Sequence, residues 1–295
     1  MSLTASLRAS ADGIATWDTT LDAAIKRVAD VPALIEEVEG IQAESGVEAR
    51  AHWAYVLSDE LLGLQNPGIA QNWLDRWSAS EVVAVPNKSG QVTRILFRMG
   101  SAGQLLIHDH LGPNGEKIAL IVSRPGSLGC FGVNESGFAC AYQPLVPTTM
   151  RGDGQGSVTL FRKLLGATTH HEAVARAKAR GSITSSGYFV ADPTNAIAVE
   201  SREAGVRAIG VFSGSAVVAH TNHVVGPLAD AHPTSKRSLA RLKVLRDLVP
   251  RGADPTLKEL IAMYKKTAAN GAIDPSNPIF AANLKPTKTQ LSWRT

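Results

Sequence analysis

Two cysteines are the first candidates for chemistry, because a thiolate is the strongest nucleophile among the side chains. Cys130 and Cys140 both lie in SLGCFGVNESGFACAYQPL, residues 127–145. They occupy apolar runs without a Lys, an Arg or a helix N-terminus beside them, and free cysteine is usually buried. Ten positions apart, they form neither a C-x-x-C redox pair nor a zinc quartet. The pattern predicts two buried packing thiols and a reducing compartment.

The segment HTNHV, residues 220–224, has polar side chains where a site on a β-scaffold would lie. The apolar run AVVA ends directly before His220, Asn222 and His223. An amide N–H₂ can stabilise the oxyanion of an acyl-transfer reaction, and an imidazole can act as a general base. Asn222 is therefore the candidate oxyanion donor, while His220 and His223 are candidates for substrate binding or for the base.

The other histidines give weaker signals. His108 and His110 in HDH lie on the same side of a predicted strand, but two imidazoles without a third ligand do not make a zinc site. His170 and His171 open a predicted helix, and we expect both to be solvated. The sequence predicts no metal site.

The composition fits a globular protein and argues against two classes of partner. Apolar residues make up 44% and charged residues 19% of the 295 residues, while aromatic residues, at 5%, are too few to favour nucleic-acid binding by stacking. No apolar run reaches about 18 residues and no signal peptide is evident, so we expect a cytoplasmic protein with no membrane partner. Residues 231–295 carry 12 Lys/Arg against 4 Asp/Glu, which a solvated helix face or an anionic ligand would explain.

The elements that must position these residues come in segregated blocks. Residues 18–57 read as helices, with Pro32 opening one of them, and β-rich runs follow from about residue 69. NESG at 134–137 predicts the turn of a β-hairpin. Thr169 and Glu172 predict a capping box, and Leu239, Leu242, Leu245 and Leu248 mark the buried face of a later helix. This order predicts an α+β fold, in which sheets pack between helix layers.

Several segments, in order, resemble the isopenicillin N (acyl-CoA:6-aminopenicillanate) acyltransferase-like family of N-terminal-nucleophile hydrolases. EEVEGIQAESGV is similar to the helix pair that precedes the nucleophile, and AQNWLDRW at 70–77 to a G-Q-N-W-D segment. GCFGVNESGFACAYQPL resembles the family's G-x-N-E-x-G-L-A hairpin, and FVADPTNAIAVES a strand pair that ends in a glutamate, here Glu200. HTNHV is similar to an H-x-N-H motif, and SKRSLARLKVL to the helix after it.

The resemblance implies a four-layer αββα sandwich in one compact domain. Residues 1–57 would form a helical, pro-segment-like region and residues 58–295 the αββα core. In this family a precursor cleaves itself before a cysteine, and the new α-amino group serves as base for the thiol. The thiol then attacks an amide or thioester carbonyl.

The resemblance also implies roles for individual residues. Asn222 would form the oxyanion hole together with a backbone N–H near Tyr142 and Gln143, and Asp75 would be the acidic residue of the N-W-D segment. The family's cysteine is missing, because no cysteine precedes Cys130. Ser58, fourteen residues before Asn72, is the positional substitute and would act after cleavage of the Leu57–Ser58 bond, although YVLSDELLG reads as helix. Gln143, His220 and His223 would contact the substrate.

Two hypotheses follow from this reading. The first is an amidohydrolase or acyltransferase that acts on a small-molecule amide or acyl substrate without a cofactor, with a coenzyme A thioester as an alternative acyl donor. The second is a catalytically degenerate, uncleaved relative that binds a small ligand or a partner in the retained pocket. The sequence excludes neither hypothesis, and it does not exclude a homo-oligomer.

Overall fold

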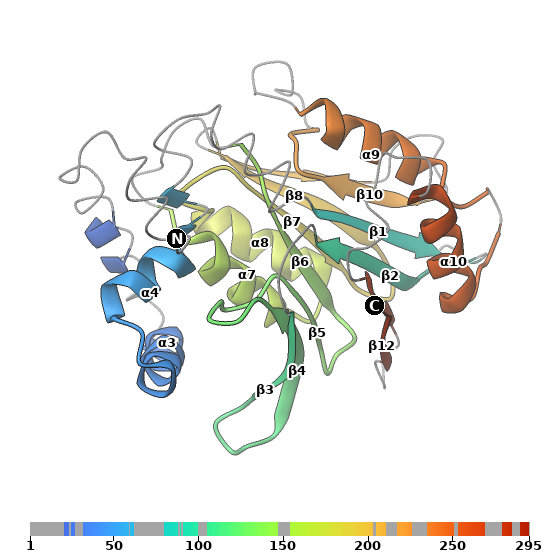
Figure 1. Ribbon diagram of the computed structural model, residues 1–295. Helices are drawn as coiled ribbons and strands as arrows, with labels where there is room; N and C mark the ends of the chain where they lie inside the picture. The colour runs from blue at the N-terminus through green and yellow to red at the C-terminus, as the bar shows by residue number, and fades with distance from the viewer. Residues whose placement is uncertain are drawn as a thin grey trace.

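The fold is seen in a computed structural model of the chain (Figure 1). The structure describes residues 21–23, 25, 26, 32–58, 60, 61, 80–87, 89, 91–99, 105–146, 154–202, 205–210, 217–225, 235–250, 253–268, 279–284 and 290–294. All structural statements below concern these residues.

The chain begins, in its described part, with two helices that pack on the larger of two sheets. Helix α3 spans Pro32–Ser45 and helix α4 spans Ala49–Val56, separated at Gly46, which has a φ of 65°. The Glu48 carboxylate caps α4 by accepting hydrogen bonds from the first-turn amides. The helical region predicted for residues 18–57 is confirmed where the chain is described.

A five-stranded antiparallel sheet carries one half of the site. Its strand order is β10-β1-β2-β11-β12, in which β10 pairs with β1 and β11 with β2 although the partners are far apart in the chain. The strands are β1 (Ser80–Pro86), β2 (Val92–Met99), β10 (Val218–Thr221), β11 (Ile279–Asn283) and β12 (Gln290–Arg294). β11 pairs antiparallel with both β12 and β2.

A seven-stranded antiparallel sheet forms the second layer. Its strands follow one another in chain order, from β3 to β9. They are β3 (Leu106–Leu111), β4 (Lys117–Ser123), β5 (Phe131–Asn134), β6 (Ala139–Pro144), β7 (Ser186–Ala191), β8 (Ala196–Arg202) and β9 (Gly205–Ile209). Gly137, with a φ of 75°, closes the β5–β6 hairpin, and the Asn134 carboxamide accepts from two amides in the turn. The hairpin predicted around NESG is confirmed.

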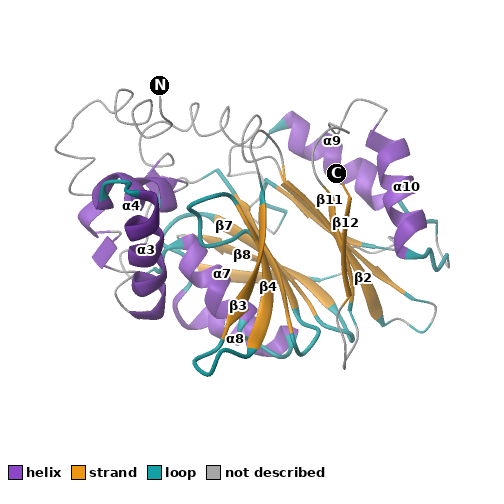
Figure 2. Cartoon of the chain, turned by 60° about the horizontal axis from the view of Figure 1, so that its bottom comes forward, coloured by secondary structure: helices purple, strands orange, loops and turns teal. Residues whose placement is uncertain are grey.

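Three hydrophobic cores divide the molecule into four layers. One core lies between the two sheets and contains Phe97, which stacks on Phe131 with ring centroids 5.2 Å apart. A second core joins the seven-stranded sheet to α3, α4, α7 (Ser157–Leu165) and α8 (His170–Arg180). A third joins the five-stranded sheet to α9 (Lys236–Arg246) and α10 (Leu257–Ala268). Figure 2 shows the sheets side by side with helices on both outer faces, so the predicted αββα sandwich is confirmed.

Two helices differ from the sequence expectation. Leu239 of α9 is 48% exposed, so the predicted buried stripe is wrong at this position, although Leu242, Leu245 and Leu248 are buried. Ser238 and Arg241 occupy the buried side of α9 instead. His170, expected to be solvated, is buried, and its Nδ1 lies 2.6 Å from Asp192 Oδ2.

The capping box of α8 is present with a shifted partner. The Glu172 amide donates to Thr169 Oγ1 at 3.2 Å, as predicted. The Glu172 carboxylate instead accepts from the backbone N–H and the hydroxyl of Thr168. The helix therefore starts where the sequence places it.

Candidate functional site

A pocket opens where the N-terminal helices meet the edge of the sandwich. It encloses about 520 Å³ of space, including open solvent at its mouth. Hydroxyl, aromatic and cationic side chains share its wall, among them Tyr55, Ser58, Ser80, Arg124, Cys130 and Tyr142. Because several of these side chains can bind or attack a carbonyl compound, the pocket is the candidate site.

Ser80 is the residue in this pocket with the most specific surroundings. It is the first residue of β1, and its Oγ accepts a hydrogen bond of 3.1 Å from Asn222 Nδ2. The backbone N–H of Ser80 donates to Asn222 Oδ1 at 2.6 Å. One amide side chain therefore contacts both the nitrogen and the hydroxyl of the serine.

Strand pairing explains why these two residues meet across 142 positions of sequence. β1 pairs antiparallel with β10, with Glu81 opposite Thr221 and Val82 opposite His220. The next step along each strand brings Ser80 beside Asn222. Along β1 the side chains alternate between the two faces, so Val82 and Ala84 lie between the sheets. Ser80 shares their face.

The structure places Ser58, the residue predicted as nucleophile, on a different element. Ser58 is helical, one residue beyond the Leu57 cap of α4, and is 7% exposed. It lines the same pocket as Ser80. The Asn222 amide, however, contacts Ser80, and Ser58 does not begin a strand.

Tyr142 and Gln143 lie on β6, opposite this part of β1. The Tyr142 backbone N–H, expected to serve in an oxyanion hole, donates to the Cys130 carbonyl at 2.7 Å. Gln143 Nε2 donates to the carbonyls of Ser80 and His220 at 3.3 and 3.1 Å. Gln143 is fully buried and holds the two sheets together beneath Ser80.

His220 continues this buried link between the sheets. Its Nδ1 lies 2.8 Å from Gln143 Oε1 and its Nε2 lies 3.2 Å from Glu200 Oε1. Glu200 also accepts from the backbone N–H of Val225. Both ring nitrogens of His220 therefore face other side chains, and these contacts brace the strand end that carries Asn222.

His223 lies under the start of α9. Its Nδ1 lies 2.8 Å from the Ser238 hydroxyl and 3.0 Å from that of Thr221. Burial and the neighbouring His220 lower the pKa of His223 to about 3, so the ring is neutral at pH 7. Neither histidine is among the described residues that line the pocket, so direct substrate contact by His220 and His223 stays a prediction.

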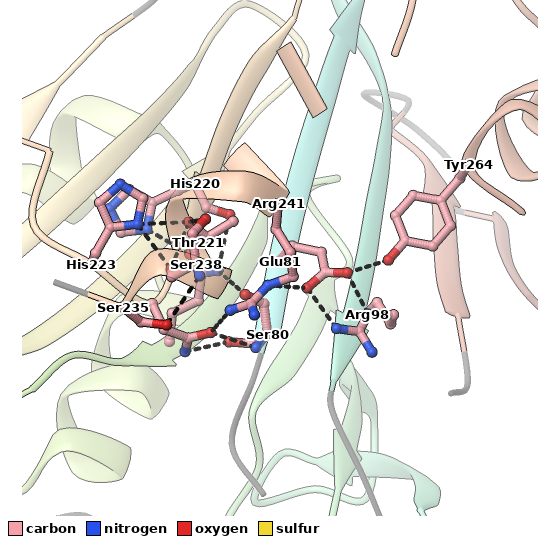
Figure 3. Close-up of polar contacts among 12 residues, drawn as sticks. Ser80, Glu81, Arg98, His220, Thr221, His223, Ser235, Ser238, Arg241 and Tyr264 are labelled. Carbon is pink, nitrogen blue, oxygen red and sulfur yellow. Dashed lines mark hydrogen bonds and ion pairs between the residues drawn. The ribbon is translucent and has the colours of Figure 1, made fainter. Parts of the chain in front are cut away.

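A buried ionic cluster lies behind β1, on the side of α9 and α10 (Figure 3). Glu81 accepts from Arg98 Nε, from Arg98 Nη2 at 2.8 Å and from the Tyr264 hydroxyl, and Arg241 Nε lies 3.2 Å from its Oε2. Burial alone would raise the pKa of the Glu81 carboxyl. The guanidiniums of Arg98 and Arg241, with the hydrogen bonds from Arg98 and Tyr264, outweigh burial and hold that pKa below its ordinary value.

The remaining candidates are placed as follows. Asp75, in the N-W-D segment, lies outside the described residues. Cys130 and Cys140 are both free and buried, as predicted, and burial raises the pKa of the Cys140 thiol. His110 lies 2.9 Å from the guanidinium of Arg162, a neighbour unsuited to a bound cation. Among the described residues no group of three His, Cys, Asp or Glu side chains could hold a metal ion.

Ser80 is the residue that sequence reasoning missed. The family's cysteine lies before the N-W-D segment, whereas Ser80 comes after it. A signal was available, since Ser80 is the hydroxyl directly before EVVAVP, the first β-rich run of the chain. Ser80 begins the strand that this run forms, β1.

Comparison with known proteins gives a family and a distant structural likeness. The family model described as acyl-coenzyme A:6-aminopenicillanic acid acyl-transferase matches residues 118–272, more than half of the chain. A search of curated proteins finds no match. Among solved structures, penicillin V acylase from Agrobacterium tumefaciens is 14% identical, with a TM-score of 0.44, over 72% of this chain and 82% of the acylase.

The family match covers β4 to α10, and with them Tyr142, Gln143, Asn222 and Arg241. None of the described helices is both long enough and apolar enough to cross a membrane. The family resemblance read from the motifs is thus confirmed by an independent comparison. The chain belongs to the acyl-coenzyme A:6-aminopenicillanic acid acyl-transferase family, and is therefore an enzyme of the acyltransferase and amidohydrolase type.

Proposed function

We propose that the protein transfers or hydrolyses the acyl group of a small amide or thioester, with Ser80 as the nucleophile. The observation that carries this proposal is the double contact of Ser80 with Asn222, through both its backbone N–H and its hydroxyl, at the edge of a pocket. Ser58 is the alternative hydroxyl in the same pocket. We favour Ser80 because it begins a strand and already contacts an oxyanion donor.

The base for the hydroxyl would be the α-amino group of Ser80 itself. That group exists only after the Ala79–Ser80 peptide bond is cut. In the cut, Ser80 Oγ attacks the Ala79 carbonyl carbon, the C–N bond breaks as its nitrogen takes a proton, and water hydrolyses the resulting ester. The free amine can then accept the hydroxyl proton when Ser80 attacks a substrate carbonyl.

Asn222 would stabilise the negative charge that develops on the carbonyl oxygen. Its Nδ2 donates to Ser80 Oγ and, at 3.0 Å, to the carbonyl of Pro144. In the tetrahedral intermediate, the N–H that now points at Ser80 would turn to the substrate oxygen. The leaving amine or thiol takes a proton, and water or a second amine then releases the acyl group from Ser80.

The pocket supports a substrate with an apolar or aromatic acyl part. Tyr55, Tyr142, Val56, Val158 and Met99 contribute to its wall, and Arg124 is the cation among its lining residues. We propose that an anionic group of the substrate lies near Arg124. Acyl transfer from a coenzyme A thioester would use the same nucleophile and needs no bound cofactor. Gln143, His220 and His223 would support the site from beneath.

The test compares Ser80→Ala with Ser58→Ala in the full-length protein. Intact-mass analysis of the wild type should show fragments 1–79 and 80–295, and Ser80→Ala should stay whole. Turnover of a panel of N-acyl anilides and acyl-coenzyme A thioesters should be lost in Ser80→Ala and kept in Ser58→Ala. If the wild type is instead cleaved after Leu57, and turnover is lost in Ser58→Ala, Ser58 is the nucleophile.

A binding protein without turnover is the second candidate. The observation in its favour is that Asn222 Nδ2 is already engaged with Ser80 and Pro144. An intact 31.2 kDa chain that is stabilised thermally by acyl compounds, and that neither cleaves itself nor turns them over, would identify this role. Detectable hydrolysis that disappears in Ser80→Ala would exclude it.

A further inference from the structure

The ionic cluster behind β1 is the feature that the proposed chemistry leaves unused. Ser80 and Glu81 are consecutive in an extended strand, so their side chains lie on opposite faces of the sheet. Ser80 faces the pocket, and Glu81 faces α9 and α10, where it meets Arg98, Arg241 and Tyr264 (Figure 3). The cluster is thus one residue away from the proposed nucleophile.

Arg241 connects this cluster to the site. Its Nε lies 3.2 Å from Glu81 Oε2, and its Nη2 donates to Asn222 Oδ1 at 2.9 Å. Arg241 comes from α9, where it is 3% exposed although its neighbour Leu239 is 48% exposed. The helix therefore buries a guanidinium beside the amide that contacts Ser80.

The contacts of Asn222 show what this guanidinium does. Oδ1 accepts from the Ser80 N–H and from Arg241, which are both donors. A carboxamide turned by 180° would place its N–H₂ against both of these donors, so Arg241 opposes that orientation. Nδ2 is thereby aimed at Ser80 Oγ. A positive charge on the oxygen side also polarises the amide and strengthens its N–H as a donor.

We propose that Arg241, held by Glu81, is a positioning residue that fixes the Asn222 carboxamide with its N–H₂ toward the Ser80 hydroxyl and the developing oxyanion. The inference rests on the proposed role of Ser80. It assigns to α9 and to the buried Glu81 carboxylate a part in acyl transfer, although neither touches the substrate.

The central variant is Arg241→Met, measured on the full-length protein with a p-nitrophenyl ester. Glu81 would keep Arg98 and Tyr264 as partners in this variant, so one carboxylate would still face one guanidinium, and we expect the variant to fold. We expect kcat to fall by about 10- to 100-fold with KM within about twofold of the wild type, since loss of an oxyanion donor costs about 10²–10³ in kcat. Arg241→Lys, which keeps the charge, should recover part of the loss.

A double-mutant cycle separates positioning from mere stability. In an Asn222→Ala background, Arg241→Met should cause no further fall in kcat, because the amide that it orients is gone. Arg162→Met is the matched control. Arg162 is another buried arginine paired with a carboxylate, that of Glu37, and it does not contact Asn222. It should lower the thermal midpoint while kcat stays within about twofold.

Each outcome discriminates. Ser80→Ala with wild-type turnover, or a wild type without turnover, overturns the proposed function and this inference together. An inactive Ser80→Ala beside an Arg241→Met variant of undiminished kcat overturns the inference alone. The inference alone is also overturned if Arg241→Met lowers kcat by the same factor in the Asn222→Ala background, or if Arg162→Met causes an equal fall in kcat. If Arg241→Met does not fold, Arg241→Lys with the same cycle decides.

Discussion

Ser80 and Ser58 illustrate how much the backbone decides about a hydroxyl. Both are buried serines on the wall of one pocket. Ser58 lies within a helical segment, in which backbone N–H groups donate to carbonyls one turn earlier. Ser80 begins a strand, and its N–H and hydroxyl both meet Asn222. Only the second setting gives the nitrogen and the oxygen of one residue a shared partner.

At this scale His223 yields a prediction about acid stability. Its pKa is about 3 in the folded protein, mainly through burial, and about 6.5 when unfolded. The unfolded chain therefore binds the proton first, and stability is lost as the pH falls from about 6.5 toward 3. The His223→Gln variant should lose about 3 kcal/mol less than the wild type between pH 7 and pH 4.

Urea unfolding at a series of pH values measures this difference. The matched control is His171→Gln, the same substitution at an exposed histidine. Parallel profiles for the wild type and His223→Gln would show that the buried imidazole does not titrate with folding.

Among the elements, α3 is joined to the core by one ion pair of unusual burial. Arg162 of α7 donates to both carboxylate oxygens of Glu37, at 3.1 and 2.7 Å, and also to the carbonyl of Leu128. The arginine side chain is 6% exposed and the glutamate 25%. This pair joins an N-terminal helix to the layer that flanks the pocket.

Glu37→Ala should therefore lower the free energy of unfolding by about 1–3 kcal/mol, between the values for surface and buried pairs. The control is Asp109→Ala, which breaks the exposed pair with Lys117 and should cost less than about 1 kcal/mol. Chemical denaturation of both variants provides the comparison. Equal effects would mean that the burial of Arg162 adds nothing to the pair.

The elements also show what could be predicted from sequence. The helices and hairpins follow from periodicity and turn residues, the four layers are what the family resemblance implies, and both were confirmed. The buried stripe predicted for α9 was wrong at Leu239 alone, which is exposed, while Arg241 lies inward beside Glu81. The burial of His170 was missed because Asp192, its partner, is 22 residues away. Interactions between distant segments leave little trace in local patterns.

The same reason explains the partial success at the site. Asn222 was a candidate because it lies within a visible motif, HTNHV, and the structure brings it into contact with a serine that lines the pocket, while its catalytic role stays a prediction. Ser80 has no motif around it, and its contact with Asn222 arises from the pairing of β1 with β10. Local sequence patterns do not reveal which of two distant strands will pair in the sheet.

For the whole molecule, the core between the sheets joins the two middle layers. Phe97 of the five-stranded sheet and Phe131 of the seven-stranded sheet stack with their planes 9° apart, and both are fully buried. Phe97→Ala should destabilise the protein by about 3–5 kcal/mol, as large cavities in cores do. Both layers should lose stability together, since the two rings join them.

Leu239→Ala is the control for this prediction, since the side chain is half exposed and should contribute less than about 0.5 kcal/mol. Thermal unfolding followed by circular dichroism gives both values. Two separate transitions in Phe97→Ala would indicate that the sheets unfold independently, contrary to a shared core.

The chain order of the five-stranded sheet has a consequence for timing during synthesis. Strand β1 pairs with β10, which is synthesised well over a hundred residues later. In the seven-stranded sheet, by contrast, each strand pairs with the next one along the chain. Closing so long a loop makes this pairing a late event in folding. A nascent chain that ends before residue 222 has Ser80 but lacks its amide partner. If Ser80 cuts the chain at Ala79, the cut follows the docking of β10 and Asn222 against β1, and a chain that ends before them stays whole.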